Sequence, residues 1–298
     1  MSDWGKGVIN NIGWGQGANN DIGWGSIYDK SNAGETLLSG GDFEGILNQF
    51  PGASLGLSLE LLDKEYTGFC IKVRRSSNND ELDIGFVNNE LDTASLLDFV
   101  GSGNGFVSII YDQVGSNNMT QTTANLQGQI VSNGSVILKG GKPCIIRSAD
   151  DNGGYLSTYA PNDGVTVKGM FYVGDNEGKQ SCMFGSNDGG ADYGFVVKSG
   201  STTSSFIDNN PNITASKLNG SDTTFTTRGE AFTATNLHFL LYREIEFNFE
   251  HNKLSFGYDF KKTLNLGMFT FQELVIFENT DDAVAKENNI NSRYNNIY

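Results

Sequence analysis

The sequence has few of the residues that mark the most easily recognised classes of protein. Only four of its 298 residues are proline, so this is not a proline-rich disordered chain. Its three cysteines, Cys70, Cys144 and Cys182, are odd in number and have no CxxC spacing. This predicts reduced, mostly buried thiols in a protein made in a cytoplasm. The only histidines, His238 and His251, have no serine or cysteine partner suggested by spacing, so a nucleophilic triad is unsupported.

Positive charge and long apolar runs are also scarce. The chain has 20 Lys and Arg residues against 35 Asp and Glu residues, for a formal net charge of −15. Binding to a nucleic-acid backbone relies on Lys and Arg, so we expect no nucleic-acid partner. The longest apolar stretches, such as residues 239–242, fall far short of the ~20 residues of a membrane helix. No secretory signal is visible at the N-terminus, and we expect no membrane insertion.

Glycine and aromatic residues are abundant, with 38 Gly, 20 Phe and 11 Tyr. Aromatic residues favour strands, and the hydrophobic fraction of 38% is ample for a real core. Within residues 245–250, Ile and Phe alternate with Glu and Asn, which is typical of a strand with one face in water. Length and composition therefore predict one large β domain plus an appendage.

Many short strands separated by Asn-Gly turns are expected beyond residue 50. The segments with strand character are 68–73, 82–87, 106–111, 135–138, 143–147, 165–173, 193–198, 223–228, 254–258 and 269–277. Two minor helices are expected, 93–99 with Asp92 as N-cap and Gly101 past its end, and 281–294. This pattern predicts an all-β, two-sheet sandwich over residues 51–298.

The first 30 residues carry a repeat that differs from the rest of the chain. The three tryptophans of the sequence recur ten residues apart, each followed by glycine: Trp4-Gly5, Trp14-Gly15 and Trp24-Gly25. Dense glycine prevents a stable helix, yet indoles are costly to leave exposed. We interpret residues 1–30 as an extended anchoring arm whose indoles enter pockets of another chain. The alternative is that they pack on the protein's own domain. Residues 31–50 have the composition of a linker.

Four segments carry a resemblance to a known family. They are YTGFCIKVRRSS (66–77), DIGF (83–86), LDTASLLDFVG (91–101) and GFVSIIYDQ (105–113). Together they resemble the catalytic-type domain of α-L-arabinofuranosidase B, and this resemblance implies a concanavalin A-like jelly roll. Residues 271–277 and 290–294 resemble the closing strand and helix of lectin-like phage domains. Stand-alone relatives of this domain are frequent in phage appendage proteins.

The Trp-Gly arm resembles N-terminal segments of fibre proteins in phages of gut Bacteroidota, including the crAss-like group. This resemblance implies a head fibre, tail fibre or capsid decoration protein of a tailed phage, made in the host bacterial cytoplasm and located in the virion. The implied partners are a capsid, adaptor or tail protein bound through the arm, two further copies in a homotrimer, and a host surface glycan.

The catalytic residues of the enzymes that this chain resembles are not found at matching positions. Those enzymes use a glutamate nucleophile and an acid/base aspartate that follows Gly-Gly, and retaining chemistry needs two carboxylates ~5–5.5 Å apart. Segment 193–198 has no glutamate, residues 264–268 lack Gly-Gly-Asp, and Ser181-Cys182 stands where paired cysteines would fall. We therefore expect no enzyme activity, no catalytic residue and no cofactor. The alternative function is a glycosidase or depolymerase that acts on host capsular polysaccharide.

Three residues are candidates for glycan binding: Arg74, Asp112 and Tyr193. Asp112 follows a tyrosine at a strand end, where the alternative role is to cap a turn. Arg74 has a basic neighbour, Arg75, and the alternative is that one of the two lies over the sheet and pairs with Asp83. Segment 188–192 has oxygen ligands suitable for calcium, but a plain acidic turn is favoured, and we expect no metal site.

Overall fold

The computed structural model describes residues 43–147, 155–157, 166–174, 181–187, 192–198, 213–225, 230, 238–248, 253–256 and 269–298. The expected anchoring arm, residues 1–30, lies outside this part of the chain. A compact unit begins at Phe43, so residues 43–50, expected as the end of the linker, belong to the folded domain. They include helix α1 (Ile46–Gln49), whose Ile46 side chain is fully buried. The Leu47 amide donates to the Leu62 carbonyl at 3.0 Å and fixes the helix on the domain.

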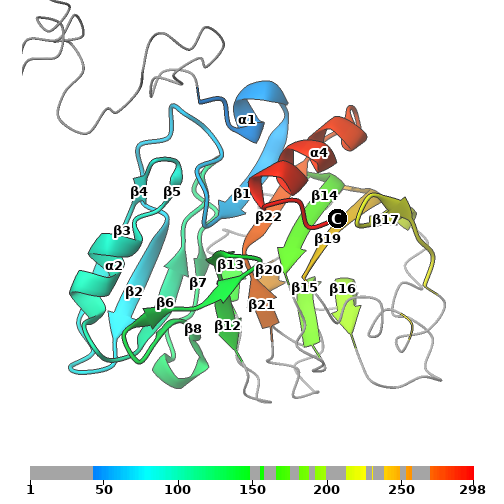
Figure 1. Ribbon diagram of the computed structural model, residues 1–298. Coiled ribbons are helices and arrows are strands. Elements are labelled where there is room, and N and C mark those ends of the chain that lie inside the picture. Colours follow the sequence, from blue (N-terminus) through cyan, green and yellow to red (C-terminus); the bar gives the residue numbers. More distant parts are fainter. Residues whose placement is uncertain are drawn as a thin grey trace, which may run out of the picture. The chain divides into compact units, whose positions relative to one another are not determined.

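One layer of the fold is a six-stranded antiparallel sheet (Figure 1). Its order is β1 (Ala53–Ser58), β22 (Glu273–Phe277), β14 (Thr166–Gly174), β19 (Phe239–Asn248), β17 (Ile213–Leu218) and β18 (Ser221–Asp222). The first strand of the domain thus pairs with its last strand, Leu57 lying opposite Leu274. This pairing brings the two ends of the domain into one layer.

The second layer is a twelve-stranded sheet with short strands. Its main path is β16 (Asp192–Lys198), β15 (Ser181–Asn187), β20 (Lys253–Phe256), β13 (Tyr155–Ser157), β7 (Met119–Thr120), β6 (Gly105–Ile110), β8 (Gly128–Ser132), β12 (Ile145–Arg147) and β21 (Phe269–Phe271). Strands β2 (Ile71–Arg75), β3 (Glu81–Ile84) and β9 (Ser135–Val136) branch from this path. Two small hairpins complete the described strands: β4 (Phe86–Val87) with β5 (Glu90–Leu91), and β10 (Leu138–Lys139) with β11 (Lys142–Pro143).

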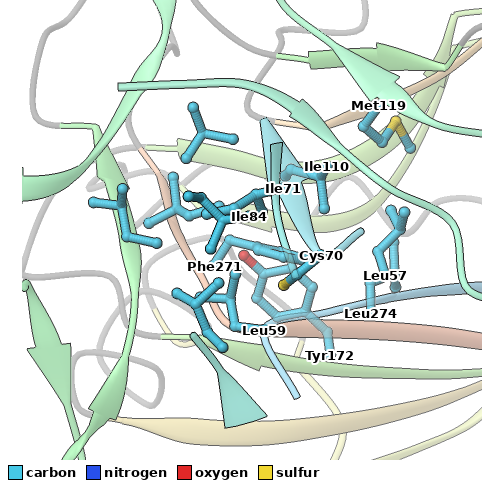
Figure 2. Packing of buried hydrophobic residues seen from close by; sticks show 14 of the residues in the cluster. Leu57, Leu59, Cys70, Ile71, Ile84, Ile110, Met119, Tyr172, Phe271 and Leu274 are labelled. Atoms are coloured by element: carbon cyan, nitrogen blue, oxygen red, sulfur yellow. The ribbon is translucent and has the colours of Figure 1, made fainter. Parts of the chain in front are cut away.

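The main hydrophobic core lies between the two sheets (Figure 2). Leu57, Leu274 and Tyr172 from the six-stranded sheet and Ile71 and Ile110 from the other are all at most 1% exposed. Because strand side chains alternate between faces, β22 contributes every second residue, Leu274 and Ile276, to this core. The predicted all-β jelly-roll sandwich is confirmed by this two-layer packing.

A second core lies on the other face of the six-stranded sheet. Helix α4 (Ala283–Arg293) packs there beside α1, as Figure 1 shows in red and blue. Ile290 and Tyr294 lie against Phe171, Tyr242 and Phe277, and the rings of Phe171 and Tyr242 stack with centroids 4.7 Å apart. The expected C-terminal helix therefore exists and covers one face of the sheet.

Local signals in the sequence are confirmed at several points. Helix α2 (Thr93–Val100) begins after Asp92, whose Oδ1 accepts a hydrogen bond from the Ser95 amide at 3.0 Å, and Gly101 follows it with a φ of 66°. The Asn-Gly pairs at 133–134 and 219–220 have positive φ at both residues, as tight hairpins require. The predicted strand 223–228 is wrong where it is described, since residues 223–225 follow β18 as irregular chain.

The described cysteines agree with the prediction of buried thiols. Cys70 and Cys144 are both free and buried. Burial raises the pKa of the Cys70 thiol well above its usual range, which keeps it protonated. Its side chain lies in the core between the sheets, where it acts as a small apolar group (Figure 2).

Candidate functional site

Asp112 is held by the backbone of a turn and is only 2% exposed. Its Oδ1 accepts hydrogen bonds from the amides of Gly56 and Val114 at 2.9 and 3.0 Å. Its Oδ2 accepts from the amides of Gly115 and Asn117, each at 3.1 Å. A carboxylate has about four acceptor positions, so these amides occupy the group. The structure favours the turn-capping alternative over a glycan contact.

Arg74 is likewise engaged by neighbouring groups of the protein. Its Nε donates to Gln127 at 2.8 Å, and its terminal nitrogens donate to Asn79 at 2.8 Å and to the Ala124 carbonyl at 3.1 Å. The guanidinium also lies over the Phe106 ring, 4.9 Å from its centroid. These contacts fix the side chain on the surface of the sheet.

The expected pairing of Arg74 or Arg75 with Asp83 is wrong. The register of β2 and β3 places Lys72 opposite Asp83, with 3.6 Å between the Lys72 Nζ and the carboxylate. The Tyr111 hydroxyl donates to the same carboxylate at 2.6 Å. Arg75 instead pairs with Asp80 in the turn that follows β2. Sequence proximity alone did not reveal this register.

The three candidate residues do not converge on one site. Arg74 lies opposite Phe106 near the start of β6, whereas Asp112 follows the end of β6. Six strand residues span roughly 20 Å. Tyr193 is in β16, and β7, β13, β20 and β15 lie between β6 and β16 in the sheet order. The Tyr193 side chain is outside the described part of the structure, so its role in glycan binding stays a prediction.

A buried cluster of charged residues was not predicted from the sequence. Glu60 and Glu273 are 5% and 0% exposed, and Arg293 at the end of α4 binds both. The Arg293 terminal nitrogens lie 2.7 and 2.6 Å from the two Glu273 oxygens and 3.2 Å from Glu60 Oε2. Lys142 Nζ bridges Glu60 Oε1 at 2.8 Å and Glu90 Oε1 at 2.5 Å. These acids and cations lie far apart in the sequence, so spacing gave no signal.

The geometry of this cluster favours a structural role over sugar binding. Burial raises the pKa of Glu60, while Arg293 and Lys142 oppose that rise. Ser58 and Tyr294 donate to Glu273 Oε2 at 2.8 and 3.2 Å. A retaining glycosidase needs its two carboxylates to flank the bond that is cleaved. Here both carboxylates face cations of the protein, which joins α4 to the sheet.

A polar cavity of about 200 Å³ lies at the β17–β18 edge of the six-stranded sheet. It is lined by Thr214, Ala215, Ser216, Thr223, Thr224, Phe225 and Arg243. Four hydroxyls, one aromatic ring and one guanidinium therefore surround the space, and no carboxylate is among these described residues. Hydroxyls and a guanidinium can donate to a polar ligand, and an aromatic ring can pack on its apolar face.

The alternation of β19 explains why Arg243 faces this cavity. Phe239 and Leu241 point into the core between the sheets, whereas Leu240 and Tyr242 pack beneath the helices. Arg243 follows the first set and is 1% exposed. The register of β17 and β19 places Ser216 directly opposite it. The cavity is thus on the inter-sheet side, away from α1 and α4.

The part of the chain that the structure describes shows neither a metal site nor a membrane-spanning helix. No group of three or more His, Cys, Asp or Glu side chains there is arranged to hold a metal ion. Among the same residues, no helix has the length and apolar character to span a membrane. The segment weighed for calcium, 188–192, lies outside the described residues except for Asp192.

Three solved structures are similar to this fold, and all are arabinofuranosidases. One is an arabinofuranosidase complexed with arabinofuranosyl-α-1,2-xylobiose, with a TM-score of 0.49 and 14% identity. The others are a GH54 α-L-arabinofuranosidase soaked with a cyclic sulfate inhibitor, at 0.47 and 14%, and a mutant soaked with 4-nitrophenyl α-L-arabinofuranoside, at 0.46 and 17%. Each match covers 80% of this chain and 62% of the other chain. No protein-family profile and no curated protein matches the sequence.

These neighbours correct one prediction. The expectation that the chain is not an enzyme is contradicted, because each neighbour is a glycoside hydrolase. That expectation rested on carboxylates missing at 193–198 and 264–268, and residues 264–268 lie outside the part of the chain that the structure describes. The similarity itself concerns the β-sandwich fold and assigns no substrate to this chain.

Proposed function

We propose that this chain is a fibre or decoration protein of a tailed phage particle that presents a carbohydrate-directed jelly roll. The observation that carries the proposal is the ten-residue repeat of Trp4, Trp14 and Trp24, each followed by glycine. Repeated indoles on a glycine-rich arm fit an anchor that becomes ordered when each ring is buried in a partner. The partner is a capsid, adaptor or tail protein of the particle.

The jelly roll is the part proposed to meet host surface glycans. Its support is the cavity at the sheet edge, where Arg243, Ser216 and Phe225 combine a cation, a hydroxyl and an aromatic ring. Concave sites of this mixed polar and aromatic lining are typical of small-ligand recognition. Clustering of several copies on a particle would strengthen a weak interaction with each glycan.

The experiment is to purify phage particles and search for the chain by mass spectrometry and immunogold labelling. We expect a stoichiometric component, with gold at the head or the tail. Gold at a single position would also decide between a head fibre and a tail fibre. Absence of the chain from particles, with abundant chain in the lysate, contradicts the particle role.

The second candidate function is a glycosidase or depolymerase that acts on host capsular polysaccharide. The observation that favours it is the resemblance of segments 66–77 and 105–113 to an arabinofuranosidase domain. Release of reducing sugar from arabinofuranosides or purified capsule, abolished by one carboxylate substitution, would support it. Release at the background rate by a folded, glycan-binding chain would favour the binding role.

The homotrimer is proposed from the form that phage fibres take, in which identical chains close on a rotation axis. Light scattering of the full chain after size-exclusion chromatography measures it directly. A mass of three times 32.3 kDa supports the trimer, and a mass of one chain contradicts it.

A further inference from the structure

We propose that the sheet surface formed by β2 and β3 binds one neutral pyranose unit of a glycan, with Phe69 as the stacking ring and Asp83 and Lys72 as the polar contacts. This inference rests on the glycan-directed half of the proposed function and deepens it, because it names the class of sugar and the surface that meets it. The site is separate from the cavity at the β17–β18 edge and includes none of the three candidates taken from the sequence.

Strand alternation places the polar groups of this site on the face of the sheet that lies away from the core, which we call the outer face. Ile71 and Ile84 lie in the core between the sheets (Figure 2). Their neighbours Lys72 and Asp83 pair in the register of β2 and β3 and therefore point the other way. The Tyr111 hydroxyl donates to Asp83 Oδ1 at 2.6 Å, which brings the Tyr111 ring to the same face.

Phe69 supplies an accessible aromatic ring beside these groups. It is 49% exposed, and its ring lies 6.1 Å from the Tyr111 ring, centroid to centroid, at an angle of 48°. Single exposed apolar residues are common on protein surfaces, but this ring adjoins a second ring that is bonded to a charged group. Apolar and polar surface thus lie side by side, which suits a sugar with a C–H face and a rim of hydroxyls.

The charged groups of the site have hydrogen-bonding capacity left for a ligand. The Lys72 and Asp83 side chains are 28% and 30% exposed, and the 3.6 Å between Lys72 Nζ and Asp83 Oδ1 is too long for a hydrogen bond. The hydrogen bonds and ion pairs that the described residues make to the Asp83 carboxylate involve Oδ1, so Oδ2 can accept from a ligand. The ammonium of Lys72 has three N–H donors. The pair can therefore accept from one sugar hydroxyl and donate to the next.

The backbone around Phe69 is fixed before any ligand binds. The Tyr66 hydroxyl donates to the Phe69 carbonyl at 2.9 Å, and the Tyr66 ring packs edge-on against Phe86. The next residue, Cys70, donates from its amide to the Ile84 carbonyl at 2.8 Å. A ring held in this way loses little conformational freedom on binding, which lowers the entropic cost of the complex.

The charges of the outer face favour a neutral sugar over an acidic one. The charges of Lys72 and Asp83 cancel each other. Glu81 is exposed and lies two residues before Asp83, on the same face of β3. Arg74, which lies opposite Glu81, is engaged by Gln127. The whole chain has a net charge of −15 and repels anions in general.

Other ligands that use exposed aromatic rings fit this surface less well. Nucleic-acid bases stack on such rings, but in a positively charged groove that follows the phosphates, and Lys72 here lies beside a carboxylate. Stable protein interfaces bury at least ~1,200 Å² and have few charged residues at their centre. One ring beside an exposed ion pair is therefore a better match for one sugar ring.

The experiment is an NMR titration of the full chain with two matched probes, methyl β-glucopyranoside and methyl β-glucuronoside, at millimolar concentrations. Every hydroxyl of the glucoside is equatorial, so both of its ring faces present C–H groups. We expect the glucoside to bind at least about three-fold more tightly and to shift the signals of residues 69–72, 83 and 111. Binding of neither probe, or equal or tighter binding of the glucuronoside, would overturn the proposal.

Substitutions then test the location. Phe69→Ala should weaken binding of the glucoside at least about five-fold, since stacking on an aromatic ring contributes a factor of this order. Asp83→Asn keeps an acceptor for Tyr111 but removes the charge, and should weaken binding about three-fold or more. The matched control is Leu138→Ala, which removes an apolar side chain that is 52% exposed on the β10–β11 hairpin. Equal effects of the Phe69 and Leu138 substitutions, in chains with unchanged thermal melts, would contradict the assignment.

These results are separable from failure of the proposed function. Glucoside-induced shifts confined to residues 214–216 and 223–225 would overturn this site and keep a glycan-directed jelly roll. Binding at Phe69 by a chain that is absent from particles would overturn the particle role and support this site.

Discussion

Two arginines, Arg293 of helix α4 and Arg243 of strand β19, have different surroundings. Arg293 is bound by Glu273 and Glu60, and its contacts join the last helix to β22. Arg243 lines a cavity among hydroxyls and an aromatic ring. A buried charge is stable only if polar partners surround it. The first arginine meets this need with carboxylates and joins α4 to the sheet, whereas the second lies in β19 and lines a polar cavity.

The largest effect should come from removing the cation of the structural cluster. Arg293→Met leaves Glu273 and Glu60 buried beside each other and should lower the free energy of unfolding by about 3–5 kcal/mol. Urea denaturation measures this change. The control is Arg75→Met, which removes a partly exposed pair with Asp80 and should cost at most ~1 kcal/mol. Similar losses of unfolding free energy for the two variants would contradict the structural role of Arg293.

The next effect tests whether Asp112 belongs with the structural polar groups. Asp112→Ala leaves four backbone amides without their acceptor and should cost on the order of 3 kcal/mol, because bonds to charged groups are strong. The exposed Asp98→Ala, also measured by urea denaturation, is the matched control. A stable Asp112→Ala variant with impaired glycan binding would instead restore Asp112 as a ligand-binding residue.

A smaller effect is expected at the cap of α2. Asp92→Ala should cost about 1 kcal/mol at pH 7, since the side chain caps the helix. Hydrogen bonds from the Ser95 side chain and amide lower the pKa of Asp92. Its stabilisation is therefore complete above the unfolded pKa and is lost as the pH falls through the lower folded pKa. Melting curves from pH 7 downwards should show the variant and the parent converge in acid. A constant difference across this range would contradict the cap.

The smallest effect on stability is expected for substitution of Glu60 in the charged cluster. Glu60→Gln should change the free energy of unfolding by no more than ~1 kcal/mol at neutral pH, because burial of the charge offsets its ion pairs. The folded pKa of Glu60 is raised, so its favourable contribution is present below the unfolded pKa and is lost as the pH rises through the folded pKa. Relative to the parent, Glu60→Gln should thus become less destabilising between acid and neutral pH, as followed by urea denaturation. If Glu60→Gln instead becomes more destabilised relative to the parent as the pH rises, the ionised form of Glu60 is stabilising.

The parts of the fold that depend on local chemistry were predictable from the sequence. Asp92 and Gly101 gave the ends of α2, and Asn-Gly pairs gave the two hairpins at 133–134 and 219–220. Strand 223–228 was predicted from its Thr and Phe residues, but residues 223–225 line the cavity instead of extending the ladder. Strand propensity did not reveal this because it carries no information about pairing.

The polar sites depend on pairing between distant segments, which spacing does not reveal. Ser216 meets Arg243 only through the register of β17 and β19, and Glu60 meets Arg293 across almost the whole domain. Asp112 was found from the sequence as a distinctive residue, but its burial against Gly56 depends on the neighbouring strand β1. The sequence therefore revealed the elements better than the contacts between them.

The most direct test of the central claim is to delete residues 1–30 and measure how much chain remains on purified particles. The compact unit begins at Phe43, so the shortened chain should stay folded by circular dichroism and keep the cavity. Quantitative immunoblotting of particles assembled with each form gives the occupancy. We expect full occupancy with the intact chain and almost none with the shortened chain. Normal occupancy without Trp4, Trp14 and Trp24 would contradict the anchor and, with it, the proposed place of this protein on the particle.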